Sequence, residues 1–315
     1  MTLSSRWRVL ALIVTLSGCA AAGGGSVEQR LESGSKKGAE GDFAGAVEDF
    51  RAAVAADDKS ALAHYHLGVA LYEKGDTVEA IRALGTAVKL DPKLNDAYLA
   101  LGNAYLKNED RKSAFLAFNE AVLNDPNNPS ALYNLGVLHY MGGRFRDAAM
   151  LLEKAQPIRP DDADIVYRLG MSRLNYGDLG KAAEALRRTV ELNPEHAEAW
   201  LNLGNILTTQ HQFDEARKNF DRALAIRPGW SDGLNSLGIL ADAQDKESEA
   251  LDYYRRALAA DPSNARVHLN LAALYEKQSK PREAIAEYES FLSTWKGEMT
   301  TAESVQKKIE ALKNR

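Results

Sequence analysis

Apolar and polar residues follow the 3.6-residue period of an amphipathic helix along most of the chain. Segment 131–140 is typical, with the sequence Ala-Leu-Tyr-Asn-Leu-Gly-Val-Leu-His-Tyr. A second segment follows each such stretch and places apolar residues at spacings i, i+4 and i+7. The paired segments predict two helices in every 34 residues, each with one buried face. Because one such hairpin cannot bury its own apolar face, we expect successive hairpins to stack.

Four columns of residues recur with the same 34-residue step. The first helix of each pair carries a glycine in six consecutive repeats, at Gly68, Gly102, Gly136, Gly170, Gly204 and Gly238. The second helix carries an alanine, at Ala80, Ala114, Ala148, Ala182, Ala216, Ala250 and Ala284. A bulky residue follows four positions later, at Leu84, Phe118, Leu152, Leu186, Phe220, Tyr254 and Tyr288. A proline ends six of the repeats, at Pro92, Pro126, Pro160, Pro194, Pro228 and Pro262.

The glycine column lies inside a predicted helix, where glycine costs about 0.5–1 kcal/mol relative to alanine. We therefore expect a second helix to approach the backbone closely at each of these positions. The alanine column is the predicted matching surface, because its side chains are also small. The proline column ends each repeat, since proline has no N–H to continue a helix.

The four columns together resemble the tetratricopeptide repeat (TPR). This resemblance implies an all-α fold, a right-handed superhelical solenoid of TPR helix hairpins with a C-terminal capping helix. The array would cover residues 27–298, with a degenerate unit at 27–60 and seven 34-residue units over 61–298. The remaining segment, 299–315, is the predicted capping helix. Three of its apolar residues have helical spacing: Val305, Ile309 and Leu312.

The amino terminus predicts a secretory signal. Arg6 and Arg8 precede an apolar run that is far shorter than the roughly 20 residues needed to span a bilayer. The run ends in Leu-Ser-Gly-Cys, which resembles the lipobox of bacterial lipoproteins. The resemblance implies a lipoprotein signal peptide over residues 1–18, a palmitate-type acyl anchor on Cys19 and a flexible tether over 19–26. The alternative is that Cys19, the only cysteine, lies by chance beside an ordinary cleavage site.

Ala20 follows the predicted lipidation site. In the sorting pattern of Gram-negative lipoproteins, aspartate at this position favours retention in the inner membrane. The resemblance therefore implies a lipid anchor in the outer membrane, with the array on the periplasmic face. A Gram-positive source, in which the same lipobox would place the chain outside the plasma membrane, is the alternative.

Composition and motifs exclude several kinds of function. The net charge of −5 falls to −7 if Arg6 and Arg8 leave with the signal, which argues against binding nucleic acid. No phosphate-binding loop, nucleophile elbow or zinc-protease motif occurs. The histidines lack metal-ligand spacing: His64, His66, His139, His196, His211 and His268. We therefore expect no enzyme activity, no metal and no cofactor.

The TPR resemblance implies a concave surface lined by the second, fifth, sixth, ninth, twelfth and thirteenth residues of each unit. These columns contain five tyrosines, Tyr65, Tyr72, Tyr133, Tyr140 and Tyr167. They also contain five asparagines, Asn103, Asn134, Asn202, Asn205 and Asn270. An amide both donates and accepts, so a row of asparagines can hold an extended peptide backbone of any sequence. The alternatives are packing of the tyrosines between helices and solvation of the asparagines.

One TPR subtype clamps the terminal carboxylate of a peptide with lysine, asparagine and arginine. Asn103, Asn134 and Arg168 match that pattern in three consecutive units. Leu99 and Asp164 occupy the positions of the two lysines, which weakens the capture of an anion. The pattern therefore favours a peptide groove of amides and tyrosines, with Arg168 included, over a true carboxylate clamp.

An anchor followed by a TPR array is typical of a lipid-anchored scaffold or adaptor. The resemblance implies that it binds protein or extended peptide segments of envelope proteins and so assembles a cell-envelope complex. Narrower hypotheses are a pilotin-like assembly factor for a pilus secretin, a gliding-motility component and a recruiter of peptidoglycan hydrolases. An enzyme and a surface-exposed adhesin or receptor are the competing classes. The residues do not name the partners or specify an oligomeric state.

Overall fold

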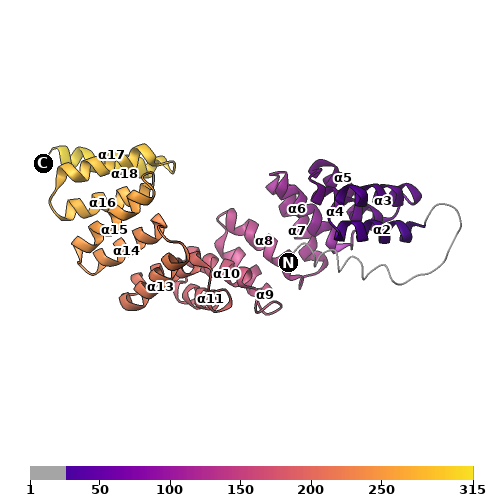
Figure 1. The fold of residues 1–315 in the computed structure, drawn as a ribbon, viewed down its shortest axis with the longest axis horizontal. Helices are drawn as coiled ribbons and strands as arrows, with labels where there is room; N and C mark the ends of the chain where they lie inside the picture. Colours follow the sequence, from indigo (N-terminus) through magenta and orange to yellow (C-terminus); the bar gives the residue numbers. More distant parts are fainter. Residues whose placement is uncertain (1–25, 315) are drawn as a thin grey trace. The chain divides into compact units, whose positions relative to one another are not determined.

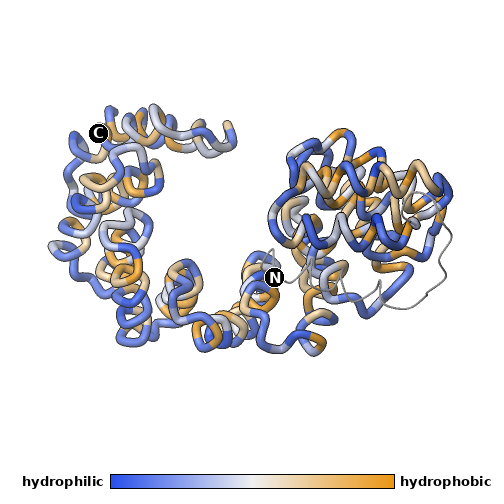
Figure 2. Tube along the Cα trace, turned by 45° about the vertical axis from the view of Figure 1, so that its right-hand side comes forward, coloured by the Kyte–Doolittle hydropathy of each residue, from blue (hydrophilic) through white to orange (hydrophobic). Residues whose placement is uncertain are grey.

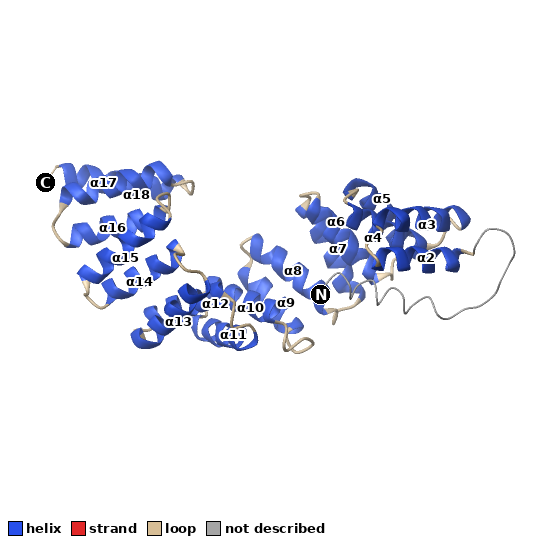
Figure 3. Ribbon diagram, viewed as in Figure 1, coloured by secondary structure: helices blue, strands red, loops and turns tan. Residues whose placement is uncertain are grey.

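Every regular element is an α-helix in the part of the chain that the structure describes, residues 26–314 of a computed structural model (Figure 3). The chain divides into two compact units, one ending at Pro160 and the other beginning at Asp161. Helix hairpins build both units, so the predicted all-α solenoid of hairpins with a C-terminal helix is confirmed. The predicted signal peptide, Cys19 and nearly all of the predicted tether lie outside the described residues.

Each unit is a series of hairpins in chain order (Figure 1). The N-terminal unit contains α2 (Val27–Ala39), α3 (Phe43–Ala56), α4 (Ala61–Lys74), α5 (Thr77–Leu90), α6 (Asn95–Lys107), α7 (Arg111–Asn124), α8 (Pro129–Met141) and α9 (Phe145–Ala155). The C-terminal unit contains α10 (Ala163–Tyr176), α11 (Leu179–Leu192), α12 (Ala197–Thr209), α13 (Phe213–Ile226), α14 (Ser231–Ala243), α15 (Glu247–Ala260), α16 (Ala265–Lys277), α17 (Pro281–Thr294) and α18 (Met299–Lys313). The two helices of a hairpin pack against each other, and the first helices of neighbouring hairpins also touch, as α14 does with α12 and α16.

The core lies between the paired helices, where apolar residues recur along every helix (Figure 2). The glycine column makes room for the bulky column rather than for the alanine column, which corrects our expectation. A Cβ added to Gly204 would lie 2.5 Å from Cε1 of Phe220, and one added to Gly136 would lie 3.1 Å from Cγ of Leu152. The bulky and alanine columns are both buried. The large side chain of the second helix therefore fills the space that glycine leaves on the first.

The turn inside each hairpin contains one residue in the left-handed backbone region. Glycine occupies this position in half of the hairpins, at Gly41, Gly75, Gly143 and Gly177. A residue with a side chain occupies it in the others, at Glu109, His211, Asp245 and Ser279. The left-handed region costs an L-residue about 1–2 kcal/mol, so the four turns without glycine contain backbone strain.

The C-terminal helix α18 covers the apolar face of the last hairpin. Val305, Ile309 and Leu312 are buried in the same cluster as Tyr288 of α17. Lys308 Nζ donates to the hydroxyl of Tyr288 over 3.1 Å, and that hydroxyl in turn donates to Glu276. The helix thus replaces the next hairpin that a longer stack would supply.

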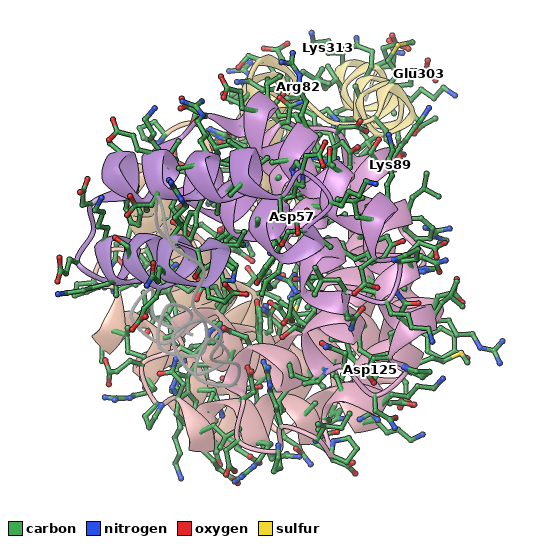
Figure 4. All side chains as sticks on the ribbon, turned by 90° about the vertical axis from the view of Figure 1, so that its right-hand side faces the viewer. Asp57, Arg82, Lys89, Asp125, Glu303 and Lys313 are labelled. Carbon is green, nitrogen blue, oxygen red and sulfur yellow. The ribbon has the colours of Figure 1, made fainter. Side chains whose placement is uncertain are left out.

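Exposed charges of both signs cover the outside of the N-terminal unit, as Asp57, Arg82 and Lys89 illustrate (Figure 4). Several charges join consecutive hairpins, such as Arg51 with Glu79 at 2.7 Å. Because such pairs lie in water, each stabilises the fold by at most about 1 kcal/mol.

Candidate peptide-binding groove

A groove of about 460 Å³ crosses the first helices of three consecutive hairpins in the C-terminal unit, α12, α14 and α16. We call it the C-terminal groove and define it by its lining residues: Leu201, Asn202, Asn205, Thr208, Thr209, Asp232, Asn235, Ser236, Ile239, Arg266, Leu269 and Asn270. All of them occupy the columns that the TPR resemblance assigns to the concave surface. The groove therefore forms where the first helices of successive hairpins lie side by side.

Amide side chains from all three helices meet in this groove. Nδ2 of Asn270 donates to Oδ1 of Asn235 over 2.9 Å, which joins α16 to α14. Nδ2 of Asn202 donates to the backbone oxygen of Glu198 in its own helix over 2.8 Å. Among the described residues, nothing donates to Oδ1 of Asn202 or Asn270, and the Asn235 amide nitrogen has no acceptor. The groove thus offers acceptors and a donor in alternation, which matches the polar groups of an extended peptide.

Apolar groups and hydroxyls complete the lining. Ile239 is 39% exposed on α14, while Leu201 is nearly buried on α12. Ser236 is 5% exposed and presents a hydroxyl from within the groove wall. A ligand side chain can therefore contact Ile239 while its backbone bonds to the amides.

Charges of both signs flank the groove. Asp232 accepts a hydrogen bond from Nδ2 of Asn264 over 3.0 Å, and Arg266 is exposed at the rim. Further along the same helices, Lys277 lies 2.9 Å from Asp245 and 3.1 Å from Asp242. Hydrogen bonds to Asp245 and then Asp242 raise the pKa of Lys277. Because Lys277 is paired with carboxylates and Asp232 lines the groove together with Arg266, the site does not present the excess positive charge of a carboxylate clamp.

The structure brings Asn202, Asn205 and Asn270 together in the groove and places the other predicted polar residues elsewhere. Asn103 on α6 and Asn134 on α8 are half-buried residues of the N-terminal unit. Arg168 lies on α10 in the C-terminal unit, with its Cζ 5.9 Å from the ring centre of Tyr167. A binding role for these three residues stays a prediction.

The five predicted tyrosines are half-buried, and most make specific packing contacts. Lys107 Nζ lies 4.5 Å from the ring centre of Tyr72 and donates to its backbone oxygen over 3.0 Å. Ring centres are also close in the other pairs: Tyr65 with His66 and Tyr140 with Phe145 at 5.3 Å, and Tyr167 with His196 at 4.2 Å. Tyr133 is half-buried on α8. The contacts of Tyr72, Tyr140 and Tyr167 thus extend beyond their own helices, whereas Tyr65 and His66 are neighbours within α4.

Asn235 connects two helices of the groove but was not among the predicted asparagines. It lies at the fifth residue of its unit, whereas the asparagine rows were sought at the sixth and ninth residues. Ser236 and Ile239 were missed for a different reason, because neither residue type indicates peptide binding by itself. The six columns that the TPR resemblance assigns to the concave surface include all three positions, so these residues could have been predicted from the columns.

The described part of the chain contains no group of three or more His, Cys, Asp and Glu side chains arranged to hold a metal ion. None of its helices is both long and apolar enough to cross a bilayer.

The hairpins and the groove across their first helices define a TPR protein. Residues 10–232 match the family model of the cilia and flagella-associated protein 70 C-terminal domain, and residues 243–279 match the model of the TPR repeat. Because the first match covers more than half of the chain, the protein belongs to that family of TPR domains. No curated protein is significantly similar to the chain in sequence.

Solved TPR structures share the fold. YrrB, a TPR protein with an unusual peptide-binding site, is 24% identical with a TM-score of 0.56, over 60% of this chain and 97% of YrrB. PilF of Pseudomonas aeruginosa is 21% identical with a TM-score of 0.55, over 70% of this chain and 97% of its own. A TPR protein of Parabacteroides merdae is 15% identical with a TM-score of 0.62, over 81% of this chain and 99% of its own. At these identities the likeness concerns the fold alone.

Proposed function

We propose that the protein is a lipid-anchored TPR scaffold that holds an extended segment of a partner protein while a bacterial cell-envelope complex assembles. The observation that carries the binding part of this proposal is the amide row of Asn202, Asn235 and Asn270 across three helices. Their free donor and acceptors suit a peptide backbone, and Ile239 suits one apolar side chain of the bound segment. Binding through the backbone would let one groove accept segments of different sequence.

The anchor part of the proposal depends on the sequence around Cys19. Leu-Ser-Gly-Cys after a basic and apolar leader supports acylation of that thiol, and Ala20 supports sorting to the outer membrane. Two or more acyl chains would hold the array at the membrane surface stably, because one chain alone binds only reversibly. The array would then face the periplasm and keep the bound segment near the membrane.

Crosslinking in the cell tests the binding part. A photoreactive amino acid replaces Asn205 in the groove, and a control protein carries it at Glu184, an exposed position on α11. We expect a discrete adduct from position 205 only, and we expect Asn202→Ala with Asn270→Ala to remove most of it. Equal adducts from both positions, or an adduct that survives both substitutions, would reject the groove.

Cell fractionation tests the anchor part separately. Cys19→Ala should release the protein from the membrane fraction or leave it unprocessed. A substituted protein that is processed and still fractionates with membranes would contradict the lipid anchor. Protease treatment of intact cells should spare the array, whereas cleavage would favour a surface receptor.

Deletion of the protein separates the narrower hypotheses that the sequence layout raised. Loss of secretin multimers would identify a pilotin-like assembly factor. Altered glycan turnover would identify a recruiter of peptidoglycan hydrolases, and a defect confined to surface movement would identify a gliding-motility component.

A further inference from the structure

A second hollow, of about 450 Å³, lies in the N-terminal unit at the turn between α8 and α9. We call it the Phe115 pocket and define it by its lining residues: Arg111, Lys112, Phe115, Leu116, Leu138, Met141, Gly142 and Arg144. It combines the first half of α7 with the end of α8, so it belongs to a single unit and is separate from the C-terminal groove.

Large apolar side chains form the wall of the pocket. Leu116 is 64% exposed and Met141 is 51% exposed, although both are fully apolar. Phe115 and Leu138 lie beneath them, in the cluster that also contains Phe118. Isolated exposed leucines are ordinary on a protein surface, but here two exposed apolar side chains line one hollow. The pocket therefore has room and contact area for one large apolar side chain of another molecule.

The charged residues that line this pocket are all cations. No carboxylate among the described residues lies within ion-pair distance of Arg111, Lys112 or Arg144. Other arginines of the chain do have such partners, as Arg51 has Glu79. The local excess of positive charge is notable because the whole chain carries a net charge of −5.

The surroundings strengthen the positive potential. Arg111 and Lys112 occupy the first turn of α7, which has no acidic residue, so their charges add to the positive end of the helix dipole. The Arg144 guanidinium lies 5.0 Å from the ring centre of Phe115 and is thereby held over the pocket. Burial, and then the charge of Arg144, lower the pKa of the neighbouring His139, although Asp147, 3.5 Å from His139 Nδ1, acts in the opposite direction. Asp110 is occupied as the N-cap of α7, where it accepts from the backbone N–H of Ser113 over 3.0 Å.

We propose that the Phe115 pocket docks an acidic segment of a partner protein that inserts one large aliphatic or aromatic side chain between α7 and α8. Carboxylates on either side of that anchor would pair with Arg111, Lys112 and Arg144. Hot spots of binding are enriched in large aromatic anchors and in arginine, and the pocket suits such an anchor beside Arg111 and Arg144. An anionic membrane fits less well, because surface attraction to lipids requires clusters of about 4–8 basic residues.

A designed peptide provides the test. The probe is a fluorescein-labelled peptide of about nine residues, with one central tryptophan and glutamates on both sides. We expect the full chain to bind it, and added salt to weaken that binding. Arg111→Glu with Arg144→Glu should raise the Kd at least about tenfold. Leu116→Asp should weaken binding similarly, and its exposed position predicts that the helical circular dichroism is kept.

Matched controls make the result specific. Arg82→Glu with Lys89→Glu applies the same charge reversal to exposed residues of α5 in the same unit (Figure 4) and should leave the Kd unchanged. A peptide with alanine in place of tryptophan should bind at least about tenfold more weakly. The proposal is overturned if the full chain ignores the probe, if both charge reversals act equally, or if the alanine peptide binds as well. Capture of phosphatidylglycerol vesicles through Arg111 and Arg144, without peptide binding, would also overturn it.

Discussion

The ring of Phe220 occupies the space that a side chain on Gly204 would need, with Cε1 only 2.5 Å from the position of the missing Cβ. Phe220 is fully buried in the core of the C-terminal unit, so its ring cannot move into water. A rigid aromatic ring on the second helix thus requires a glycine on the first. Opposite Gly136, Cγ of Leu152 lies farther away, at 3.1 Å, whereas Cγ of Leu84 lies 2.5 Å from the corresponding position of Gly68.

This difference predicts unequal effects of one substitution. Gly204→Ala should lower the free energy of unfolding by about 1–2 kcal/mol, because overpacking exceeds the gain in helix propensity. Gly136→Ala should be close to neutral, since the flexible Leu152 side chain can move aside. Urea unfolding followed by circular dichroism measures both. An equal loss of unfolding free energy in the two variants would show that the bulky residue on the second helix does not make glycine necessary on the first.

The left-handed turn residues give a second prediction. Glu109 has a φ of 61°, whereas Gly177 has a φ of 98° at the corresponding position of another hairpin. Glu109→Gly should raise the free energy of unfolding by about 0.5–1 kcal/mol by relieving strain, and Gly177→Ala should lower it by about 1 kcal/mol. Thermal unfolding of both variants provides the measurement. A destabilised Glu109→Gly protein would contradict the argument from backbone strain.

Residue periodicity predicted the hairpins because the same buried face recurs in every repeat. It did not reveal which surfaces touch, so alanine rather than Phe220 was expected opposite Gly204. It also missed the left-handed turn position, because Glu109 and His211 stand where other hairpins have glycine. When different residue types adopt the same backbone conformation, the position shows no recurring residue in the sequence.

The candidate groove shows the same limit. Asn202 and Asn270 follow from the TPR columns, but the bond from Asn270 to Asn235 depends on the distance between two helices. The Phe115 pocket was not predicted, because Leu116 and Met141 come from separate hairpins and gather only in the folded stack. Columns describe one helix at a time, whereas pockets arise between helices.

A buried histidine makes stability depend on pH. Burial lowers the pKa of His66 to about 4 from 6.5, and neither ring nitrogen has a hydrogen-bond partner among the described residues. The unfolded chain therefore takes up a proton near pH 6.5, while the folded chain stays neutral until about pH 4. The stability that neutral His66 contributes is fully present above pH 6.5 and is lost as the pH falls toward 4, by up to about 3 kcal/mol.

His66→Phe should remove this dependence, because a phenyl ring can stack on Phe50 as the imidazole does, with ring centres 5.3 Å apart. As the pH falls from 6.5 to 4, we expect the free energy of unfolding of the variant to increase relative to that of the unchanged protein. Denaturant titrations at several pH values measure this difference, and His211→Asn serves as the control at an exposed turn. Parallel stability curves for His66→Phe and the unchanged protein would contradict the assignment.

Asn235 provides a prediction for the proposed partner. Asn235→Ala removes the acceptor of Asn270 Nδ2 and the groove's unpaired amide donor, so partner capture through position 205 should fall at least about tenfold. Asn134→Ala, in the N-terminal unit, should reduce capture less, because Asn134 does not line the groove. Quantitative mass spectrometry of the crosslinked adduct measures both effects. A loss with Asn134→Ala but not with Asn235→Ala would mean that the bound segment lies along the N-terminal helices instead.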